Sequence, residues 1–176
     1  KFARGEPLKR ADGSTVRLER PLDFVAVTDH AEWLDFTLLC ESEHAAAVPD
    51  SQNLLSKRGP ENGGQLFRQY VVPSITAANP QPLPPCAENP SACKDLALDR
   101  WQSLQAQTDA FNAPCEFTTL HGYEWSHTPN FSHAHRNVIF RSDAVTEQAI
   151  DYIRHPTLSS FWNALDQQCR VSDGCR

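Results

Sequence analysis

Short apolar segments that alternate with helical patterns constrain the fold of this chain more than any other feature. Residues 22–28, with the sequence LDFVAVT, are rich in β-branched and aromatic side chains and are bounded by polar residues. Such a short apolar segment is typical of a buried strand, and the same pattern recurs at 115–124 and 135–140. Helices are predicted at 31–47, 91–112, 145–153 and 157–169. This alternation predicts an α/β fold with a largely parallel sheet.

Two of the predicted helices show a clear apolar face. Over 91–112, which Ser91 can cap, four apolar residues and one threonine recur at helical spacing, and over 157–169 apolar residues line one side. These residues are Ala97, Trp101, Leu104, Thr108 and Phe111 in the first helix, and Leu158, Phe161, Trp162 and Leu165 in the second.

One long segment lacks a regular pattern. Residues 48–90 are irregular and proline-rich, apart from a short helix predicted near 65–72. A structureless stretch of this length is unusual inside a compact domain. We therefore treat residues 1–176 as one domain with an insertion at 48–90 that lies near a functional face.

Charge and hydropathy exclude two classes of partner. The net charge is -6 and the pI is about 5.6, and no basic stripe offers the counterion release that duplex nucleic acid binding requires. A small phosphorylated substrate remains compatible with this charge. No apolar segment approaches the about 18 residues of a membrane span.

Six cysteines favour an oxidising compartment. Two pairs are close in sequence and bracket turn-forming residues, so each pair could close a small loop. The two remaining cysteines would then form a long-range pair. The pairs are Cys86 with Cys93, Cys169 with Cys175, and Cys40 with Cys115. None has the spacing of a structural zinc site. A periplasmic or secreted protein is the favoured interpretation, and a cytosolic protein with free buried thiols is the alternative.

Residues with catalytic chemistry lie at the ends of the predicted strands. Asp29 and His30 follow the first strand directly, Glu124 ends the second, and His135 begins the third. Active sites of α/β folds lie at the carboxyl ends of strands, and imidazole and carboxylate ligands suit zinc, manganese or iron rather than calcium. We predict that His30, Glu124 and His135 bind divalent metal, in a number left open, and that Asp29 orients a ligand or handles a proton.

Each of these residues also has a simpler interpretation, which for His135 is a solvated position in a loop. Asp29 could cap the following helix, and His30 could be a turn or core residue. Glu124 could form a salt bridge with Arg136 or Arg141. His133 lies two residues before His135 and would share its face of an extended strand, whereas His121 is predicted to be a core residue.

The sequence contains no GxSxG elbow, P-loop or GxGxxG motif.

Several segments together resemble a known family. LDFVAVTDHAEW resembles the second motif of the PHP superfamily (polymerase and histidinol phosphatase domains). The wider set FARGEPLK, RPLDFVAVTDHAEW, PCEFTTLHGYEW, HRNVIFR and FWNALDQQC is similar to the PHP-like family DUF3604. The resemblance covers most of the chain except roughly 48–90.

The resemblance implies part of a distorted (βα)7 barrel with two or three metal ions. His30 matches a metal-binding histidine with Asp29 as its partner, Glu124 the carboxylate that bridges ions, and His135 the ligand that follows. His133 has no counterpart in the family pattern.

In the family pattern an HxH motif precedes the FARGEPLK segment, a PHN-like segment comes just after the helix that resembles FWNALDQQC, and an Asp-x-His comes late; this sequence has no match at those places. The chain begins with Lys1 and has no methionine, so we expect an internal fragment that needs the remainder of the same protein to complete its site. Alone it is expected to hold metal poorly and to be inactive.

These observations lead to one main functional prediction and two alternatives. We predict a metal-dependent hydrolase, a phosphoesterase in which metal-bound hydroxide attacks a small phosphorylated or ester substrate. The alternatives are a non-catalytic metal-containing module that binds a ligand, and a disulfide-stabilised interaction domain without metal.

Overall fold

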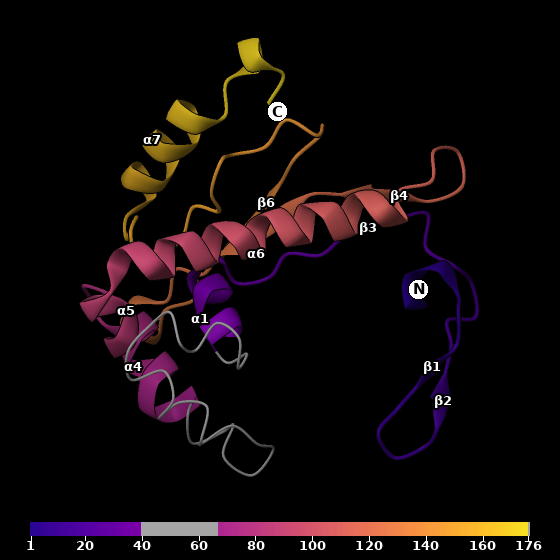
Figure 1. Cartoon of the computed structure of the whole chain (residues 1–176), viewed down its shortest axis with the longest axis horizontal. Coiled ribbons are helices and arrows are strands. Elements are labelled where there is room, and N and C mark those ends of the chain that lie inside the picture. The colour runs from indigo at the N-terminus through magenta and orange to yellow at the C-terminus, as the bar shows by residue number, and fades with distance from the viewer. Residues whose placement is uncertain (40–66, 176) are drawn as a thin grey trace.

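The computed structural model describes residues 1–39 and 67–175 (Figure 1). The described residues form a mixed α/β structure with three sheets of two strands each. The strands are β1 (Leu8–Lys9), β2 (Thr15–Val16), β3 (Phe24–Ala26), β4 (Thr118–Leu120), β5 (Gly122–Trp125) and β6 (Arg136–Ile139). Figure 1 shows β1 and β2 as a hairpin that extends away from the other strands.

The strands differ from the predicted largely parallel sheet. β3 pairs with β4 in parallel, but β1 with β2 and β5 with β6 are antiparallel. The short loop 126–135 lets β6 return beside β5 directly, whereas a parallel neighbour would need a long crossover. The prediction of a largely parallel sheet was therefore wrong for the described residues, and no closed barrel is formed among them.

The predicted second strand is divided at His121. β4 ends at Leu120, β5 begins at Gly122, and the two pair with different strands. An isolated parallel bridge between His30 and Glu124 then continues the direction of the β3–β4 pair. The segment 118–125 thus changes strand partners at His121, and His30, which follows β3, lies alongside β5.

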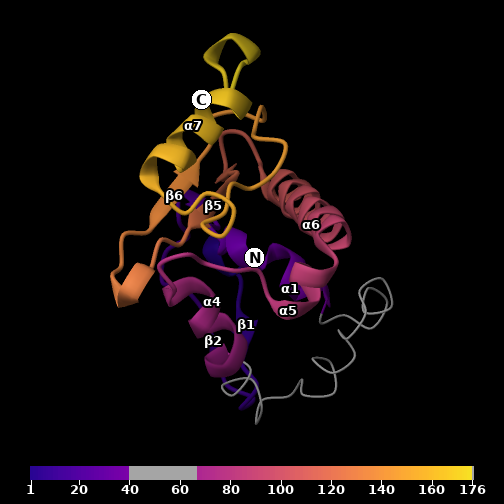
Figure 2. The ribbon, with the colours of Figure 1, turned by 90° about the vertical axis from the view of Figure 1, so that its left-hand side faces the viewer.

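The described helical elements are mostly short. They are the 3-10 turns Phe2–Arg4, Ala31–Trp33, Pro129–Phe131 and Val171–Asp173, the π-helical turn Phe67–Val71, and the helices α1 (Leu34–Leu39), α4 (Val72–Thr76), α5 (Pro84–Glu88), α6 (Pro90–Phe111) and α7 (Leu158–Gln168). α6 is the long helix that crosses Figure 1; it contacts α1 and β4, and Figure 2 shows it beside α1 and α5.

Most of the predicted helices are present, with different starting points. Residues 31–39 are helical but begin with a 3-10 turn, and 40–47 lie outside the described residues. α6 confirms the predicted helix, yet Asn89 rather than Ser91 is its N-cap, because Pro90 occupies the first helical position, which proline favours. Of the predicted insertion, residues 67–90 contain a π-helical turn, α4 and α5, whereas 48–66 lie outside the described residues.

The predicted helix at 145–153 was wrong. This segment is irregular, and Thr146, Ile150 and Tyr152 within it are fully buried. Its backbone groups bond to side chains from distant parts of the chain: Trp101 donates from Nε1 to the Thr146 carbonyl at 2.9 Å, and the Tyr152 N–H donates to Glu32 at 2.7 Å. These tertiary bonds satisfy the backbone without a helix.

α7 confirms the predicted helix at 157–169. Thr157 caps it and forms a capping box with Ser160. Its predicted apolar face is only partly buried, because Phe161 and Ala164 are covered whereas Leu158 and Trp162 are exposed.

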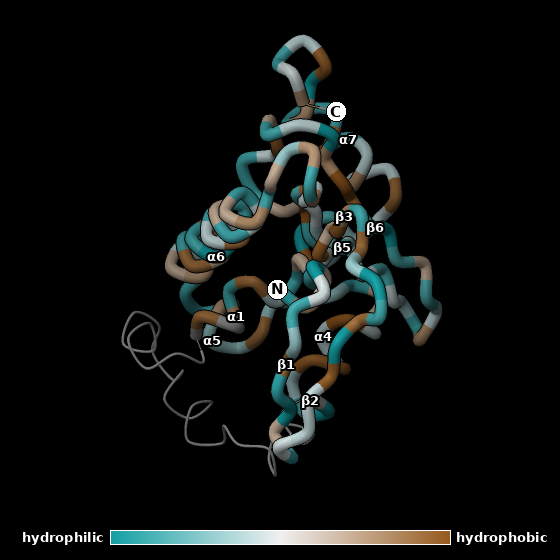
Figure 3. Tube along the Cα trace, turned by 90° about the vertical axis from the view of Figure 1, so that its right-hand side faces the viewer, coloured by the Kyte–Doolittle hydropathy of each residue, from teal (hydrophilic) through white to brown (hydrophobic). Residues whose placement is uncertain are grey.

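Large aromatic residues form the main core. The buried set comprises Ala31, Leu34, Trp101, Tyr123, Trp125, Phe140, Ile150, Tyr152, Phe161, Ala164 and Cys175. Trp125 stacks on Phe161 at 4.7 Å between ring centroids. β3, by contrast, is not the buried strand that was predicted, since Phe24 is 64% exposed and Val27, just after the strand, is 61% exposed. Figure 3 shows hydrophilic and hydrophobic residues mixed around the turns of α6.

Two of the three possible cysteine pairs form disulfides. Cys86–Cys93 joins α5 to α6, and Cys169–Cys175 closes the turn after α7. Of the third pair, Cys115 is an exposed free cysteine, and Cys40 lies outside the described residues. No described helix has both the length and the apolar character to cross a membrane.

Gly122, the first residue of β5, allows an unusually close approach of the backbone. A Cβ atom at this position would lie 2.8 Å from the Val138 carbonyl oxygen and 3.1 Å from Cγ2 of Thr28. Glycine is therefore required where β5 passes between β6 and the end of the segment that contains β3.

Candidate metal site

The three predicted metal ligands meet at the carboxyl end of β5. His30 precedes the turn Ala31–Trp33, Glu124 lies in β5, and His135 lies immediately before β6. The Glu124 N–H donates to the Asp29 carbonyl at 2.9 Å, which holds the chain after β3 against β5. Because β6 pairs antiparallel with β5, the residue before β6 also lies near the end of β5.

The two imidazole rings approach different oxygens of the same carboxylate. Nδ1 of His135 contacts Oε1 of Glu124, and Nδ1 of His30 lies 3.9 Å from Oε2. The ring centroids of the two histidines are 6.2 Å apart. The structure therefore brings these three side chains together, in an arrangement where each carboxylate oxygen has its own nitrogen neighbour.

Glu124 is partly buried and has no arginine partner among residues 1–39 and 67–175. Its side chain is 18% exposed, and the ionisable side chains that contact its carboxylate among the described residues are the two histidines. Arg136, proposed as an alternative partner, donates instead to the carbonyls of Ala134 and His135 at 3.2 and 2.9 Å. The carboxylate is thus covered by groups that can be metal ligands as well as hydrogen-bond partners.

Two buried hydroxyl groups support the histidines, and the sequence analysis did not identify them. Ser126 Oγ is 2.5 Å from Nδ1 of His30, and Thr128 Oγ1 is 2.9 Å from Nε2 of His135. Both residues are buried. Glu124, Ser126 and Thr128 alternate along an extended segment, so a period of two after Glu124 was the signal that could have indicated them.

Glu32 fixes the backbone beneath this site. Its Oε1 accepts from the Ser126 N–H at 3.0 Å and from the Tyr152 N–H at 2.7 Å. Burial raises the pKa of Glu32 to about 7, although both of these hydrogen bonds lower it. Its position two residues after His30 is the only sequence signal for it, and an acidic residue in a helical turn is too common to be informative.

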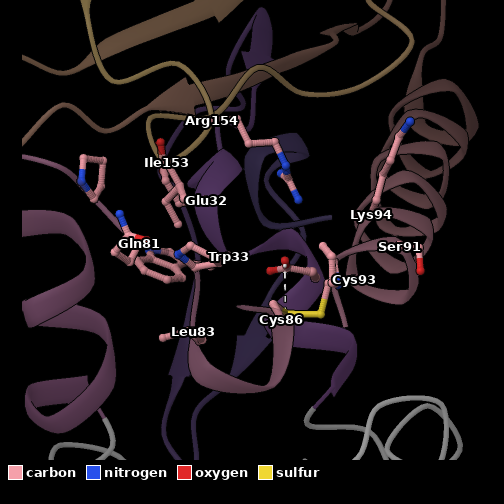
Figure 4. A pocket seen from close by; sticks show the side chains of 14 residues that line it. Glu32, Trp33, Gln81, Leu83, Cys86, Ser91, Cys93, Lys94, Ile153 and Arg154 are labelled. Carbon is pink, nitrogen blue, oxygen red and sulfur yellow. Dashed lines mark hydrogen bonds between the residues drawn. A yellow bond between two sulfur atoms is a disulfide. The ribbon is translucent and has the colours of Figure 1, made fainter. Parts of the chain in front are cut away.

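Glu32 also lines a cavity with a volume of about 510 Å³ (Figure 4). Trp33, Lys94 and Arg154 contribute further walls, and the Cys86–Cys93 disulfide closes one side. Burial raises the pKa of Asp35, another lining residue, to about 6, while Arg154 lowers it. His30, Glu124 and His135 do not line this cavity.

The other predicted residues lie around the site with different contacts. Asp29 has an exposed side chain, and its carbonyl makes the contact with Glu124 described above. The His133 ring is 5.6 Å from that of His135. His127 stacks on Trp125 at 4.8 Å, and burial, followed by the nearby Arg136 and His135, lowers its pKa.

A second group of histidine and carboxylates lies at the amino end of β5. Nε2 of His121 is 3.1 Å from Asp109 and 4.0 Å from Asp143. His121 is buried, as predicted, whereas the two carboxylates are exposed. A third group, Asp35 with Cys86 and Cys93, offers no thiolate ligands because the two sulfurs form a disulfide.

Comparison with protein families gives one match. The model of a family described as "Protein of unknown function (DUF3604)" matches residues 1–176. Comparisons with curated proteins and with solved structures found no match.

Proposed function

Because the chain belongs to the DUF3604 family, whose description names no activity, we propose its function from the site itself: a metal-dependent hydrolase that acts on phosphoesters. One observation carries this proposal. His30 and His135 approach opposite oxygens of the partly buried Glu124 carboxylate.

The donor set fits a divalent cation. Two imidazole nitrogens and a carboxylate are the ligand types of zinc, manganese and iron, and calcium would prefer a site composed of oxygen alone. The Glu124 carboxylate has an imidazole nitrogen beside each of its oxygens, so it could contribute ligand atoms to one ion or to more than one. A bound cation would also compensate the charge of Glu124, whose burial without a partner would be costly.

Each residue then has a defined task. His30, Glu124 and His135 would hold the metal, which would lower the pKa of a water molecule and polarise a phosphoryl oxygen. Ser126 and Thr128 orient the two imidazole rings. Asp29 has an exposed side chain at the rim of the site, and its carboxylate accepts or returns a proton there. The main chain of Asp29 is held in place because its carbonyl accepts a hydrogen bond from the Glu124 N–H.

The broader context is part of the same proposal. The chain forms a portion of a PHP-like barrel, and the remainder of the same protein supplies further ligands. The substrate is a small phosphorylated or ester compound. Two disulfides support a location in the periplasm or outside the cell.

Metal analysis combined with an activity assay tests this function. The intact protein is expected to retain zinc, manganese or iron and to hydrolyse p-nitrophenyl phosphate. Glu124→Ala should lose both properties, whereas Glu116→Ala, which removes an exposed glutamate of the turn before β4, should keep both.

Three results would contradict the proposal or replace it. Metal retention without turnover of any phosphoester would favour a ligand-binding module. A protein that unfolds on reduction but does not respond to chelators would favour a disulfide-stabilised interaction domain. Equal activity of the Glu124→Ala and Glu116→Ala proteins would remove the site from the mechanism.

A further inference from the structure

The cavity that Glu32 lines has the size and the walls of a small-molecule site. Its volume of about 510 Å³ lies within the range of about 300–1,000 Å³ that is typical of ligand pockets. Trp33 and Leu83 supply apolar walls, and Figure 4 shows both around the same space as Glu32. The candidate metal ligands do not line this cavity, so a molecule held here is separate from the proposed metal.

Two buried carboxylates line the cavity, and each has an oxygen without a proton donor among the described residues. Glu32 is 4% exposed, and its Oε2 has no hydrogen-bond partner in that part of the chain. Asp35 is 9% exposed, and its Oδ1 accepts from the Phe36 N–H at 2.6 Å. Its Oδ2 lies 3.5 Å from Sγ of Cys86, which is in the disulfide with Cys93 and therefore carries no proton to donate. Burying such oxygens without a partner costs free energy.

The basic residues beside the cavity do not balance this negative charge. Arg154 is bound to Asp151, a carboxylate that is itself 2% exposed. Lys94 is exposed, so water solvates its ammonium group. Burial still raises the pKa of Asp35 to about 6, although Arg154 lowers it. The buried part of the cavity therefore lacks positive charge, and an anionic ligand would find no desolvated basic group that is unpaired among the described residues.

We propose that this cavity binds a small organic ammonium compound, with Asp35 as its counter-ion, Glu32 as a second acceptor and Trp33 as an apolar wall. An ammonium has N–H donors and no acceptor, which suits carboxylate oxygens, and an aromatic face attracts a cation. Asp35 is the better counter-ion because Glu32 already accepts from two main-chain N–H groups. The inference goes beyond the proposed function and does not depend on it.

A metal ion fits this cavity less well than an organic cation. A bound ion needs several ligand atoms that converge on one point. Among the described residues, the group of three such atoms at this cavity consists of Asp35 with Cys86 and Cys93, and the two sulfurs are bonded to each other. An ammonium needs no such shell, because each of its N–H bonds can find an acceptor separately.

The wall of the cavity is held in place before a ligand binds. Residues 80–90 are rich in proline, which fixes the backbone φ angle, and Pro80 and Pro82 line the cavity. The Cys86–Cys93 disulfide joins this segment to α6 (Figure 4). A preorganised wall lowers the entropy that is lost on binding.

Calorimetric titration of the intact protein with three compounds of similar size tests the inference. Benzylammonium, benzyl alcohol and benzoate share an aromatic ring and differ in charge. At neutral pH benzylammonium should bind at least about 10-fold more tightly than benzyl alcohol, because hydrogen bonds between charged groups are the stronger ones, and benzoate should not bind. Asp35→Asn should remove this preference, whereas Asp99→Asn, a change in α6 outside the cavity, should keep it.

NMR of the tryptophan indole N–H groups establishes where the compound binds. The Trp33 signal should shift when benzylammonium is added, whereas the signal of Trp162, which is 52% exposed on α7, should not. Thermal unfolding shows whether each variant is folded. If Asp35→Asn does not fold, the three compounds and the Trp33 signal of the wild-type protein still decide the outcome.

Equal affinity for benzylammonium and benzyl alcohol, tighter binding of benzoate, or a Trp33 signal that does not move would overturn the inference. A preference for benzylammonium that survives in a folded Asp35→Asn protein would overturn it as well. Failure of the proposed function is seen separately, because it is measured by metal content and phosphoester hydrolysis in the Glu124→Ala protein.

Discussion

The two ends of β5 carry similar residue types in opposite arrangements. At the carboxyl end the carboxylate of Glu124 is the covered group, with a side chain 18% exposed, and the His30 and His135 side chains are 49% and 33% exposed. At the amino end the His121 side chain is 6% exposed, and those of Asp109 and Asp143 are 61% and 97% exposed.

This difference is the reason that the proposed function assigns the cation to the carboxyl end of β5. Exposed carboxylates such as Asp109 and Asp143 are solvated by water, so the pair with His121 is a surface interaction of small energy. A partly buried carboxylate has lost much of that solvation and needs positive charge nearby. Buried hydroxyls support both histidines at the carboxyl end, whereas Nδ1 of His121 is buried without a partner among the described residues. Residue composition alone therefore does not distinguish a candidate metal site from a surface ion pair.

The largest expected effect separates the two ends by metal affinity. Glu124→Gln should lower the affinity for Zn²⁺ or Mn²⁺ by more than about 100-fold, because it removes a ligand rather than an indirect partner. Asp143→Asn, the matched change at the other end, should alter affinity less than about 2-fold, in keeping with a solvated carboxylate. Isothermal titration of the intact protein measures both, and a comparable loss in the two variants would break the comparison.

The next prediction tests whether burial destabilises the ionised form of a carboxylate in this protein. Burial raises the pKa of Asp35 from 3.8 to about 6. The folded state then holds this proton more tightly than the unfolded state, so the contribution of Asp35 is fully present below about pH 4 and is lost as pH rises through about 6. Relative to wild type, Asp35→Asn should gain about 2 kcal/mol of unfolding free energy between about pH 4 and about pH 7.

Urea unfolding at several pH values measures this difference. Asp99→Asn, a change in α6 outside the cavity, serves as the control and should follow the wild-type pH dependence. If Asp35→Asn also follows the wild-type curve, burial has not raised the pKa of Asp35, and the argument from burial at Glu124 is weakened with it.

The smallest effect concerns the surface pair. The Asp109 side chain is 61% exposed and contacts Nε2 of His121. Asp109→Asn replaces this carboxylate with an uncharged amide and should weaken the interaction. The unfolding free energy should fall by no more than about 1 kcal/mol, and metal content should not change. A loss of several kcal/mol, or a loss of metal, would mean that the amino end of β5 is more than a surface ion pair.

The sequence was most informative where local signals were strong. The spacing of Ala97, Trp101 and Leu104 predicted α6, and the strand-end positions of His30 and Glu124 predicted that these two residues would lie close together. Both follow from periodicity and from the direction of the chain at strand ends. His135 joins them because β6 is antiparallel to β5, which the predicted parallel sheet did not include. Whether those three residues bind metal stays a prediction.

The sequence failed where long-range contacts override local preference. Residues 145–153 have a helical pattern, but the bonds from Trp101 and Glu32 hold them in an irregular conformation. The partner change at His121 could not be predicted either, because it depends on which strand lies on each side. Ser126 and Thr128 have the common residue types of loops, and only the placement of His30 and His135 gives them a role.

The close approach at Gly122 has a consequence for how this family can vary. Glu124 lies two residues further along the same strand, and the strand reaches its position only because nothing projects from residue 122 toward Val138 and Thr28. Any side chain there would push β5 outward and carry the carboxylate away from both histidines. The Glu124 carboxylate thus reaches both histidines because residue 122 has no Cβ atom. If the site is functional, glycine at position 122 should be conserved as strictly as the ligands themselves.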